Sequence, residues 1–218
     1  MSFENITLEE KQQALDDLRQ VKTLFAERNW FPGTSGNLSI RVGEFQEDEF
    51  HFAVTASGKD KSVSTPQDFL FVDQNGQASE ATTLKPSAET LIHCEIYRLT
   101  GCGAVFHVHT VYNNLISEWL GQTGVVKAQG IELIKAFNIW EENAEIAIPV
   151  IPNYAHIPSI AAEVPGVLNP AVPGILLQNH GICAWGKNAF EAKRHLEAFE
   201  FIFEYLYRGL LLNNVPKR

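Results

Sequence analysis

The stretch GAVFHVHT, residues 103–110, places two histidines at the end of an apolar run. The run predicts a buried strand, and residues two apart on a strand face the same side. His107 and His109 therefore present two imidazoles side by side, an arrangement that suits a divalent metal with nitrogen ligands. The same pattern also fits histidines that are simply tolerated at a strand end, so the pair alone leaves both interpretations open.

A third metal ligand has to come from elsewhere in the chain. His180 is the best placed, because it lies in an Asn-His-Gly turn between two apolar strands, residues 174–178 and 182–185. His93 falls inside a helical segment, where a packed or surface position explains it. His51 lies among alternating strand residues and is expected to face solvent. His156 follows Pro-Asn-Tyr and suits the N-terminus of a helix.

Around these residues the chain alternates between strand and helix patterns. Thr7 and Glu10 predict a capping box at the start of the first helix. Pro149 and Pro152 predict that the strand carrying them lies at a sheet edge. The expected strands are residues 38–41, 50–55, 69–73, 103–109, 146–152, 174–178 and 182–185, and the expected helices are 7–28, 87–99, 110–120, 156–163 and 188–212. Interleaved elements with short connections predict one α/β domain over residues 1–218, with helices on both sides of a sheet that contains antiparallel pairs.

Composition limits the classes of function. A formal net charge of −9 disfavours a general nucleic-acid or anionic-membrane surface. No apolar run reaches the ~20 residues of a membrane helix, and the N-terminus lacks a signal pattern, so we expect a cytoplasmic protein. Cys94, Cys102 and Cys183 show no C-x-x-C spacing and are expected to be reduced thiols in or near the core.

Three loops have the composition of an anion cradle. Residues 33–37 (GTSGN) and 56–59 (ASGK) offer small side chains, hydroxyls and close backbone approach, and Lys59 adds a positive charge. Residues 85–87 (KPS) place a hydroxyl and free N–H groups at a helix start. The first two loops, each taken singly, are also explained as ordinary turns.

Two carboxylates stand out without a local reason to assign them to catalysis. Glu89 falls in the first turn of the helix that follows Ser87, where helix-dipole complementation explains it. Glu132 has Lys135 three residues on, the spacing of a helix-surface ion pair.

Taken together, five motifs occur in the order seen in the class II aldolase and adducin-head superfamily, which the chain resembles from about Leu8 to Leu212. They are Ser35-Gly-Asn37, Ser57-Gly58, Pro86-Ser-Ala-Glu89, His107-Val-His109 and Gln178-Asn-His-Gly181. The resemblance implies a three-layer α/β/α fold with a mixed, largely antiparallel central sheet. It also implies a homotetramer with its sites near subunit interfaces.

The resemblance assigns roles to these motifs as well. His107, His109 and His180 would hold one zinc ion per subunit. The substrate phosphate would be bound by Asn37, Ser57, Gly58 and Ser87, with Lys59 beside them. The substrate is then a small sugar phosphate, with neither nucleic acid nor membrane as a partner.

Within the superfamily, the segments GTSGN, TASGKD, KPSAET and ELIK most resemble dehydratases of methionine salvage, so the implied activity is that of a zinc-dependent lyase. In those enzymes the glutamate of the ELIK segment is the acid/base, a role that falls on Glu132. Aldolases place their catalytic glutamate after the Pro-Ser element, where this chain has Glu89 and some dehydratases have cysteine. The division of labour between Glu132 and Glu89 therefore stays open.

Three alternatives remain at this point. One is an aldolase of the fuculose-1-phosphate type that uses Glu89. Another is a pentulose-phosphate 4-epimerase. The last is a non-catalytic, adducin-like interaction module, although adducin-type heads lack the three metal histidines that this chain retains.

Overall fold

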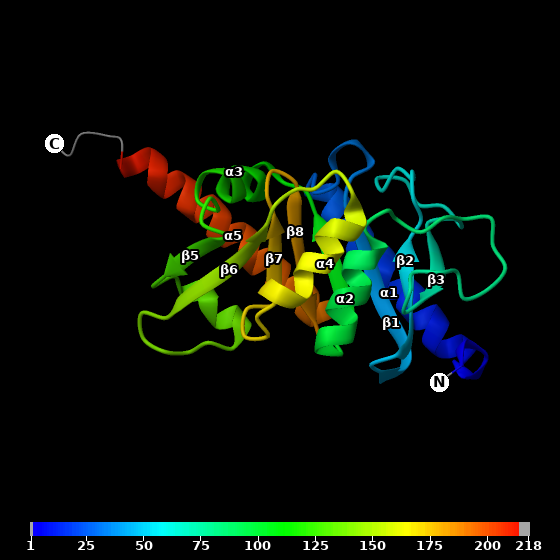
Figure 1. Cartoon of the computed structure of the whole chain (residues 1–218). Helices are drawn as coiled ribbons and strands as arrows, with labels where there is room; N and C mark the ends of the chain where they lie inside the picture. The colour runs from blue at the N-terminus through cyan, green and yellow to red at the C-terminus, as the bar shows by residue number, and fades with distance from the viewer. Residues whose placement is uncertain (1, 214–218) are drawn as a thin grey trace.

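The computed structural model describes residues 2–213 and is built on an eight-stranded sheet of order β3-β2-β1-β4-β8-β7-β6-β5 (Figure 1). Every neighbouring pair of strands is antiparallel except β6 and β7, which are parallel. The strands are β1 (Asn37–Gln46), β2 (Glu49–Thr55), β3 (Phe69–Asp73), β4 (Ala104–Val108), β5 (Val125–Gln129), β6 (Glu145–Ile151), β7 (Gly174–Leu177) and β8 (Gly181–Gly186). The predicted mixed, largely antiparallel sheet is confirmed.

Helices cover both faces of this sheet. In Figure 1, α2 (Thr90–Thr100) and α4 (Ile157–Val167) lie in front of it, whereas α1 (Leu8–Glu27) and α5 (Ala189–Asn213) lie behind. Helix α3 (Val111–Trp119) follows β4 and packs against α5. Short 3-10 helices occur at η1 (Phe3–Asn5), η2 (Pro32–Thr34) and η3 (Glu132–Phe137). The three-layer α/β/α architecture is therefore confirmed as well.

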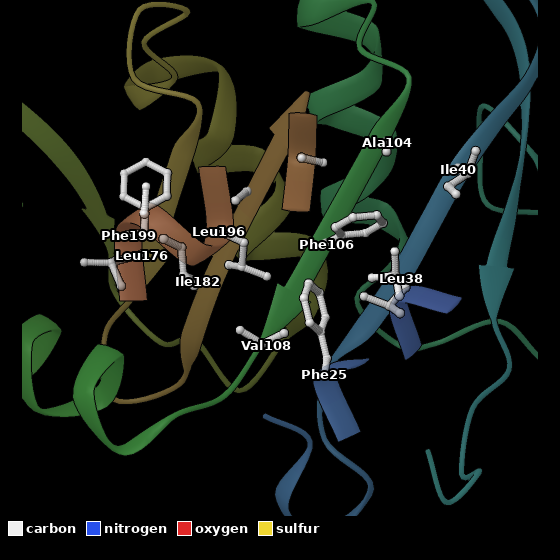
Figure 2. Packing of buried hydrophobic residues seen from close by; sticks show 14 of the residues in the cluster. Phe25, Leu38, Ile40, Ala104, Phe106, Val108, Leu176, Ile182, Leu196 and Phe199 are labelled. Atoms are coloured by element: carbon white, nitrogen blue, oxygen red, sulfur yellow. The ribbon is translucent and has the colours of Figure 1, made fainter. Parts of the chain in front are cut away.

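Strand β4 runs through the middle of the molecule and is buried on both faces. Its residues Phe106 and Val108 pack on the α1/α5 side against Phe25, Leu196 and their neighbours (Figure 2). Val105 faces the opposite side, where α2 and α4 cover a second cluster. A strand enclosed on both faces reads as an unbroken apolar run, as GAVFHVH does.

The start of α2 differs slightly from the expected one. The helix begins at Thr90 with Glu89 at its N-cap, not at Ser87. Ser87 lies outside the helix, since its N–H donates to Thr55 O at 3.2 Å and Pro86 forms an isolated bridge with Ala56. These bonds hold residues 85–87 against the end of β2 and place Glu89 where the helix starts.

The prediction that the proline-containing strand lies at an edge is wrong, because β6 lies between β7 and β5. Pro149 pairs with Val125, the first residue of β5, and the ladder with β7 begins only at Val150. Pro149 has no N–H to donate, and it lies at the end of the ladder between β5 and β6 and before the first pair of the ladder between β6 and β7. Strand β5, the true edge, was not predicted.

Other local predictions hold in the described part of the chain. Thr7 and Glu10 form the capping box, and Cys94, Cys102 and Cys183 are buried free thiols. Within residues 2–213, no helix combines the length and apolarity needed to cross a membrane.

Candidate metal centre

Glu89, His107, His109 and His180 converge at one end of the sheet. One ligand atom from each lies within 4.8 Å of all the others. The two neighbouring histidines come from the end of β4, His180 from the turn between β7 and β8, and Glu89 from the start of α2. The structure therefore brings together the three predicted metal ligands and one of the two predicted catalytic carboxylates.

The surroundings of His107 leave its Nε2 directed at the cluster. Its side chain is fully buried, and its Nδ1 lies 3.0 Å from the carbonyl of Ile182, a contact that fixes the tautomer with a proton on Nδ1. Its Nε2 lies 2.8 Å from Nε2 of His109 and 3.5 Å from Glu89 Oε2. Burial lowers the pKa of His107 to about 4, so at neutral pH it is the neutral imidazole that a metal ligand must be.

The loop that carries His180 is held by α3. Asn179 adopts φ 52°, and Glu118 Oε2 accepts hydrogen bonds from Gln178 Nε2 at 3.0 Å and Asn179 Nδ2 at 2.9 Å. Asn114 Nδ2 donates to the carbonyl of His180 at 3.0 Å. These contacts direct His180 Nε2 to 2.7 Å from Glu89 Oε1.

Gly181 shows why the residue after His180 is a glycine. A Cβ there would lie 2.5 Å from the carbonyl of Val108 and 2.8 Å from the His107 ring. Only a residue without a side chain lets the turn approach the histidine strand this closely.

Glu89 is the anionic member of the cluster. Its side chain is 13% exposed, and Asn37 Nδ2 donates a hydrogen bond to its Oε2. Burial opposes ionisation of Glu89, but the adjacent His107, His180 and His109 outweigh it and hold the pKa of the carboxyl well below its usual range. The group is therefore a carboxylate across the neutral range.

The donor set of the cluster fits a divalent transition metal. Three imidazoles and one carboxylate are ligands that zinc accepts, whereas magnesium and calcium prefer all-oxygen sites. Two buried polar atoms at the cluster, His180 Nδ1 and Asn37 Oδ1, have no hydrogen-bond partner among the described residues. Partly unsatisfied polar groups of this kind are characteristic of a binding site.

The three glycine- and serine-containing loops meet beside the cluster. Ser57 N–H donates to Lys85 O at 2.9 Å, which joins the second loop to the third. Ser57 and Gly58 are exposed, Ser87 is half-buried, and a Cβ on Gly58 would meet nothing within 4 Å. The backbone here is therefore open to a ligand. Of the other two predicted phosphate ligands, Asn37 bonds to Glu89, and Lys59 donates to Gln67 Oε1 at 3.1 Å.

Lys61 lies beside these loops and was missed from the sequence. It is only 5% exposed, and its Nζ donates to the carbonyl of Thr34 at 2.7 Å. Its charge acts on both Glu89 and His109. The segment SGKDK contains two lysines, and nothing in their order tells which of them turns inward.

Glu132 lies at the other end of the sheet. Strands β4, β7 and β6 all end on the histidine side, and β5 runs antiparallel to β6, so β5 ends on the opposite side, just before Glu132. Four strand spacings separate β5 from β4, about 19 Å at about 4.8 Å each. Glu132 is 83% exposed and pairs with Lys135 at 2.9 Å. Within one chain the two predicted carboxylates therefore do not share a site.

The three other histidines considered from the sequence lie outside the cluster. His93 is fully buried, and its Nδ1 lies 2.7 Å from Ser39 Oγ. His51, expected to face solvent, is half-buried with its Nδ1 2.8 Å from Ser79 Oγ. His156 is the N-cap of α4, as predicted.

Comparison with known proteins agrees with this geometry. A family model for the class II aldolase and adducin N-terminal domain matches residues 16–207. The chain is 55% identical over 196 residues to a methylthioribulose-1-phosphate dehydratase of Geobacillus kaustophilus, covering 90% of this chain and 92% of the relative. It is 53% identical over 196 residues to the protein of that name from Bacillus subtilis, covering 89% and 92%.

Solved structures show the same fold at lower identity. A Thermus thermophilus L-fuculose-1-phosphate aldolase aligns with a TM-score of 0.70 and 23% identity, over 94% of this chain and 98% of the other. YgbL of Escherichia coli, described as a putative aldolase/epimerase/decarboxylase, aligns with a TM-score of 0.74 and 22% identity, over 97% and 94%. The chain therefore belongs to the class II aldolase and adducin N-terminal domain family.

Proposed function

We propose that this protein is a zinc-dependent lyase that dehydrates 5-methylthioribulose 1-phosphate to 2,3-diketo-5-methylthiopentyl 1-phosphate in methionine salvage. The observation that carries the proposal is the cluster of three imidazoles and one carboxylate, which lies beside three loops with the composition of an anion cradle. The chain that carries this cluster has a sequence identity of 53–55% with proteins named methylthioribulose-1-phosphate dehydratase.

His107, His109 and His180 would hold the metal, with Glu89 as a fourth donor or as its neighbour. A divalent cation supplies a Lewis acid that draws charge onto the carbonyl and hydroxyl oxygens of a ketose. Burial lowers the pKa of His107 and His109, so these two imidazoles need no deprotonation before they bind it.

Dehydration requires that a proton leave C3 and that the C4 hydroxyl depart as water. Glu89 is ionised and largely enclosed, so we assign it the base that takes the C3 proton. A proton must also reach the departing C4 oxygen. After these steps the enol gains a proton at C4 and becomes the diketone.

We assign that second proton transfer to Glu132 of another copy of the chain. The resemblance gives Glu132 the acid/base role, and its distance from the cluster within one chain leaves a neighbouring copy to supply it. The surface near Glu132 favours such a contact, because Trp140 is 68% exposed there and Lys135 Nζ lies 5.8 Å from its ring. The proposed assembly is a homotetramer with sites near its subunit interfaces.

Aldolase and epimerase activities are the alternatives that the same cluster supports. Both use a metal-stabilised ketose phosphate, and the likeness to fuculose-1-phosphate aldolase extends to the fold. Identity of about half to dehydratases favours dehydration. A cytoplasmic location stays a prediction from the sequence.

Product identity tests the proposal. Purified protein incubated with 5-methylthioribulose 1-phosphate is expected to release the diketone, and His107→Ala is expected to lose both bound zinc and turnover. Release of an aldehyde and a three-carbon phosphate would instead establish an aldolase, and an epimer formed without loss of water would establish an epimerase. Full activity after removal of all metal would contradict the zinc site.

A further inference from the structure

Two lysines are buried within residues 2–213, and of these only Lys22 has a counter-charge there. Lys22 is 2% exposed and pairs with Asp68 at 2.7 Å, while also donating to Val63 O at 2.6 Å. Lys61 is 5% exposed, and no carboxylate of the described residues lies within ion-pair distance of it. A buried ammonium group without an anion is costly, because neither water nor a carboxylate compensates its charge.

The contacts that Lys61 makes stabilise its positive charge less than a carboxylate would. Its Nζ donates to the carbonyl of Thr34 and lies 5.7 Å from the centre of the Phe31 ring. Burial accordingly lowers the pKa of Lys61 to about 8, which the Glu89 carboxylate partly opposes. The side chain remains largely a cation at neutral pH and has donor capacity beyond its single hydrogen bond.

Lys61 is also located where an anionic ligand has access. Through Thr34 it joins the loop of residues 33–37 to its own loop, and a Cβ on Gly33 or Gly58 would meet nothing within 4 Å. The loop that it contacts lies against the histidine strand, because a Cβ on Gly36 would lie 2.8 Å from the carbonyl of His107, and Lys61 is therefore on the cluster side.

Contacts of Asp68 fix the position of the loop that carries Lys61. Asp68, the partner of Lys22, also accepts hydrogen bonds from Thr65 N–H at 3.0 Å and Thr65 Oγ1 at 2.7 Å. The carbonyl of Asp68 accepts from Ala56 N–H at 2.7 Å. The paired lysine therefore anchors the segment that presents the unpaired one.

We propose that Lys61 Nζ binds the phosphate group of the substrate. The inference rests on the proposed function, in which the phosphate is carried on C1, next to the C2 carbonyl that faces the cluster. A phosphate so close to the reacting carbons must lie beside the metal ligands, and Lys61 is the buried cation on that side. Lys59, the candidate from the sequence, is instead bonded to Gln67 on the same loop.

Binding of inorganic phosphate to the zinc-loaded protein, measured by titration calorimetry, tests this role without turnover. Lys61→Met is expected to weaken phosphate binding about 10- to 100-fold, the usual effect of losing a charge-assisted hydrogen bond. Lys61→Arg keeps the charge and is expected to retain most of the affinity. Lys127→Met, which removes an exposed lysine on β5, is the control and is expected to bind phosphate like the wild type.

Further measurements separate binding from a structural role. Lys61→Met is expected to raise KM for the sugar phosphate with a much smaller change in kcat, while its zinc content and melting temperature stay near those of the wild type. Unchanged phosphate affinity in Lys61→Met, a larger loss in Lys59→Met, or equal losses in the Met and Arg variants would each overturn the inference. If Lys61 governs phosphate affinity but no diketone forms, the proposed reaction fails and the anion site stands.

Discussion

The two ends of the sheet carry the two carboxylates that sequence motifs nominate, in opposite surroundings. At the histidine end, Glu89 is 13% exposed and faces imidazoles that stabilise its charge. At the other end, Glu132 is 83% exposed and has a lysine partner. The state of a carboxylate follows from its surroundings, so Glu89 is an enclosed anion beside three imidazoles and Glu132 is a solvent-exposed member of an ion pair.

A third carboxylate, Glu200, shows how burial changes the pKa of a glutamate that has no imidazole neighbours. Glu200 on α5 is 6% exposed and accepts hydrogen bonds from Thr110 Oγ1 at 2.6 Å and Asn113 Nδ2 at 2.8 Å. Burial, with a smaller contribution from Glu204, raises its pKa to about 7 despite those bonds. The histidine neighbours are therefore what separates Glu89 from an ordinary buried glutamate.

The largest expected effect comes from Glu89→Gln. The amide keeps the size of the side chain but can neither take a proton nor place a negative charge beside the imidazoles. Turnover is expected to fall about 1,000-fold, within the usual range for loss of a general base. Steady-state kinetics with metal content measured on the same samples checks this. Turnover near the wild-type rate would show that Glu89 is not the base.

The next effect concerns stability and follows from Glu200. In the unfolded chain this carboxyl has a pKa near 4.5, and in the folded protein about 7, so the folded state retains the proton between those values. The free energy of unfolding should therefore fall as pH rises from about 5 to 8, by about 3 kcal/mol from this group.

Glu200→Gln removes this contribution. Its stability is expected to fall less over that pH interval than that of the wild type, as measured by urea unfolding at pH 5 and pH 8. Equal pH dependence in the two proteins would mean that Glu200 is ionised throughout. The comparison is made between variants because other groups titrate over the same interval.

A smaller effect is expected at the turn that carries His180. Glu118 holds Gln178 and Asn179, and Glu118→Gln replaces one acceptor oxygen with a donor. Zinc affinity is expected to fall about tenfold, as for other residues that orient metal ligands. Turnover should recover at saturating zinc, which Glu89→Gln should not do. Loss of turnover that excess zinc does not restore would contradict a positioning role.

The elements were predictable from sequence to the extent that their signals are local. The capping box of α1 and the apolar run of β4 depend on neighbouring residues, and both predictions are confirmed. The edge position of β6 was mispredicted because the effect of Pro149 depends on where β5 begins, and β5 is short and only half-buried.

The candidate site depends on contacts that join distant segments. Asn37 and Glu89, 52 residues apart, meet in a hydrogen bond that no local pattern indicates. The inward direction of Lys61 depends on its bond to Thr34, 27 residues away. The order of the motifs predicted that the three histidines belong to one site. That Glu132 lies at the opposite end of the sheet from this site follows only from the fold.

The last prediction asks whether a second copy brings Glu132 to the histidine end. His107→Ala and Glu132→Gln chains should each be inactive alone, and an assembly formed from equal amounts should regain activity. Random mixing leaves about one quarter of the sites with an intact histidine cluster and an intact Glu132 from the neighbour. If both groups acted within one chain, no chain in the mixture would carry both, and activity would stay absent. Differently tagged chains, purified through both tags, show that mixed assemblies formed, so absent activity in them would exclude action between copies. Full activity of Glu132→Gln alone would instead remove Glu132 from the reaction and leave both proton transfers to the histidine end.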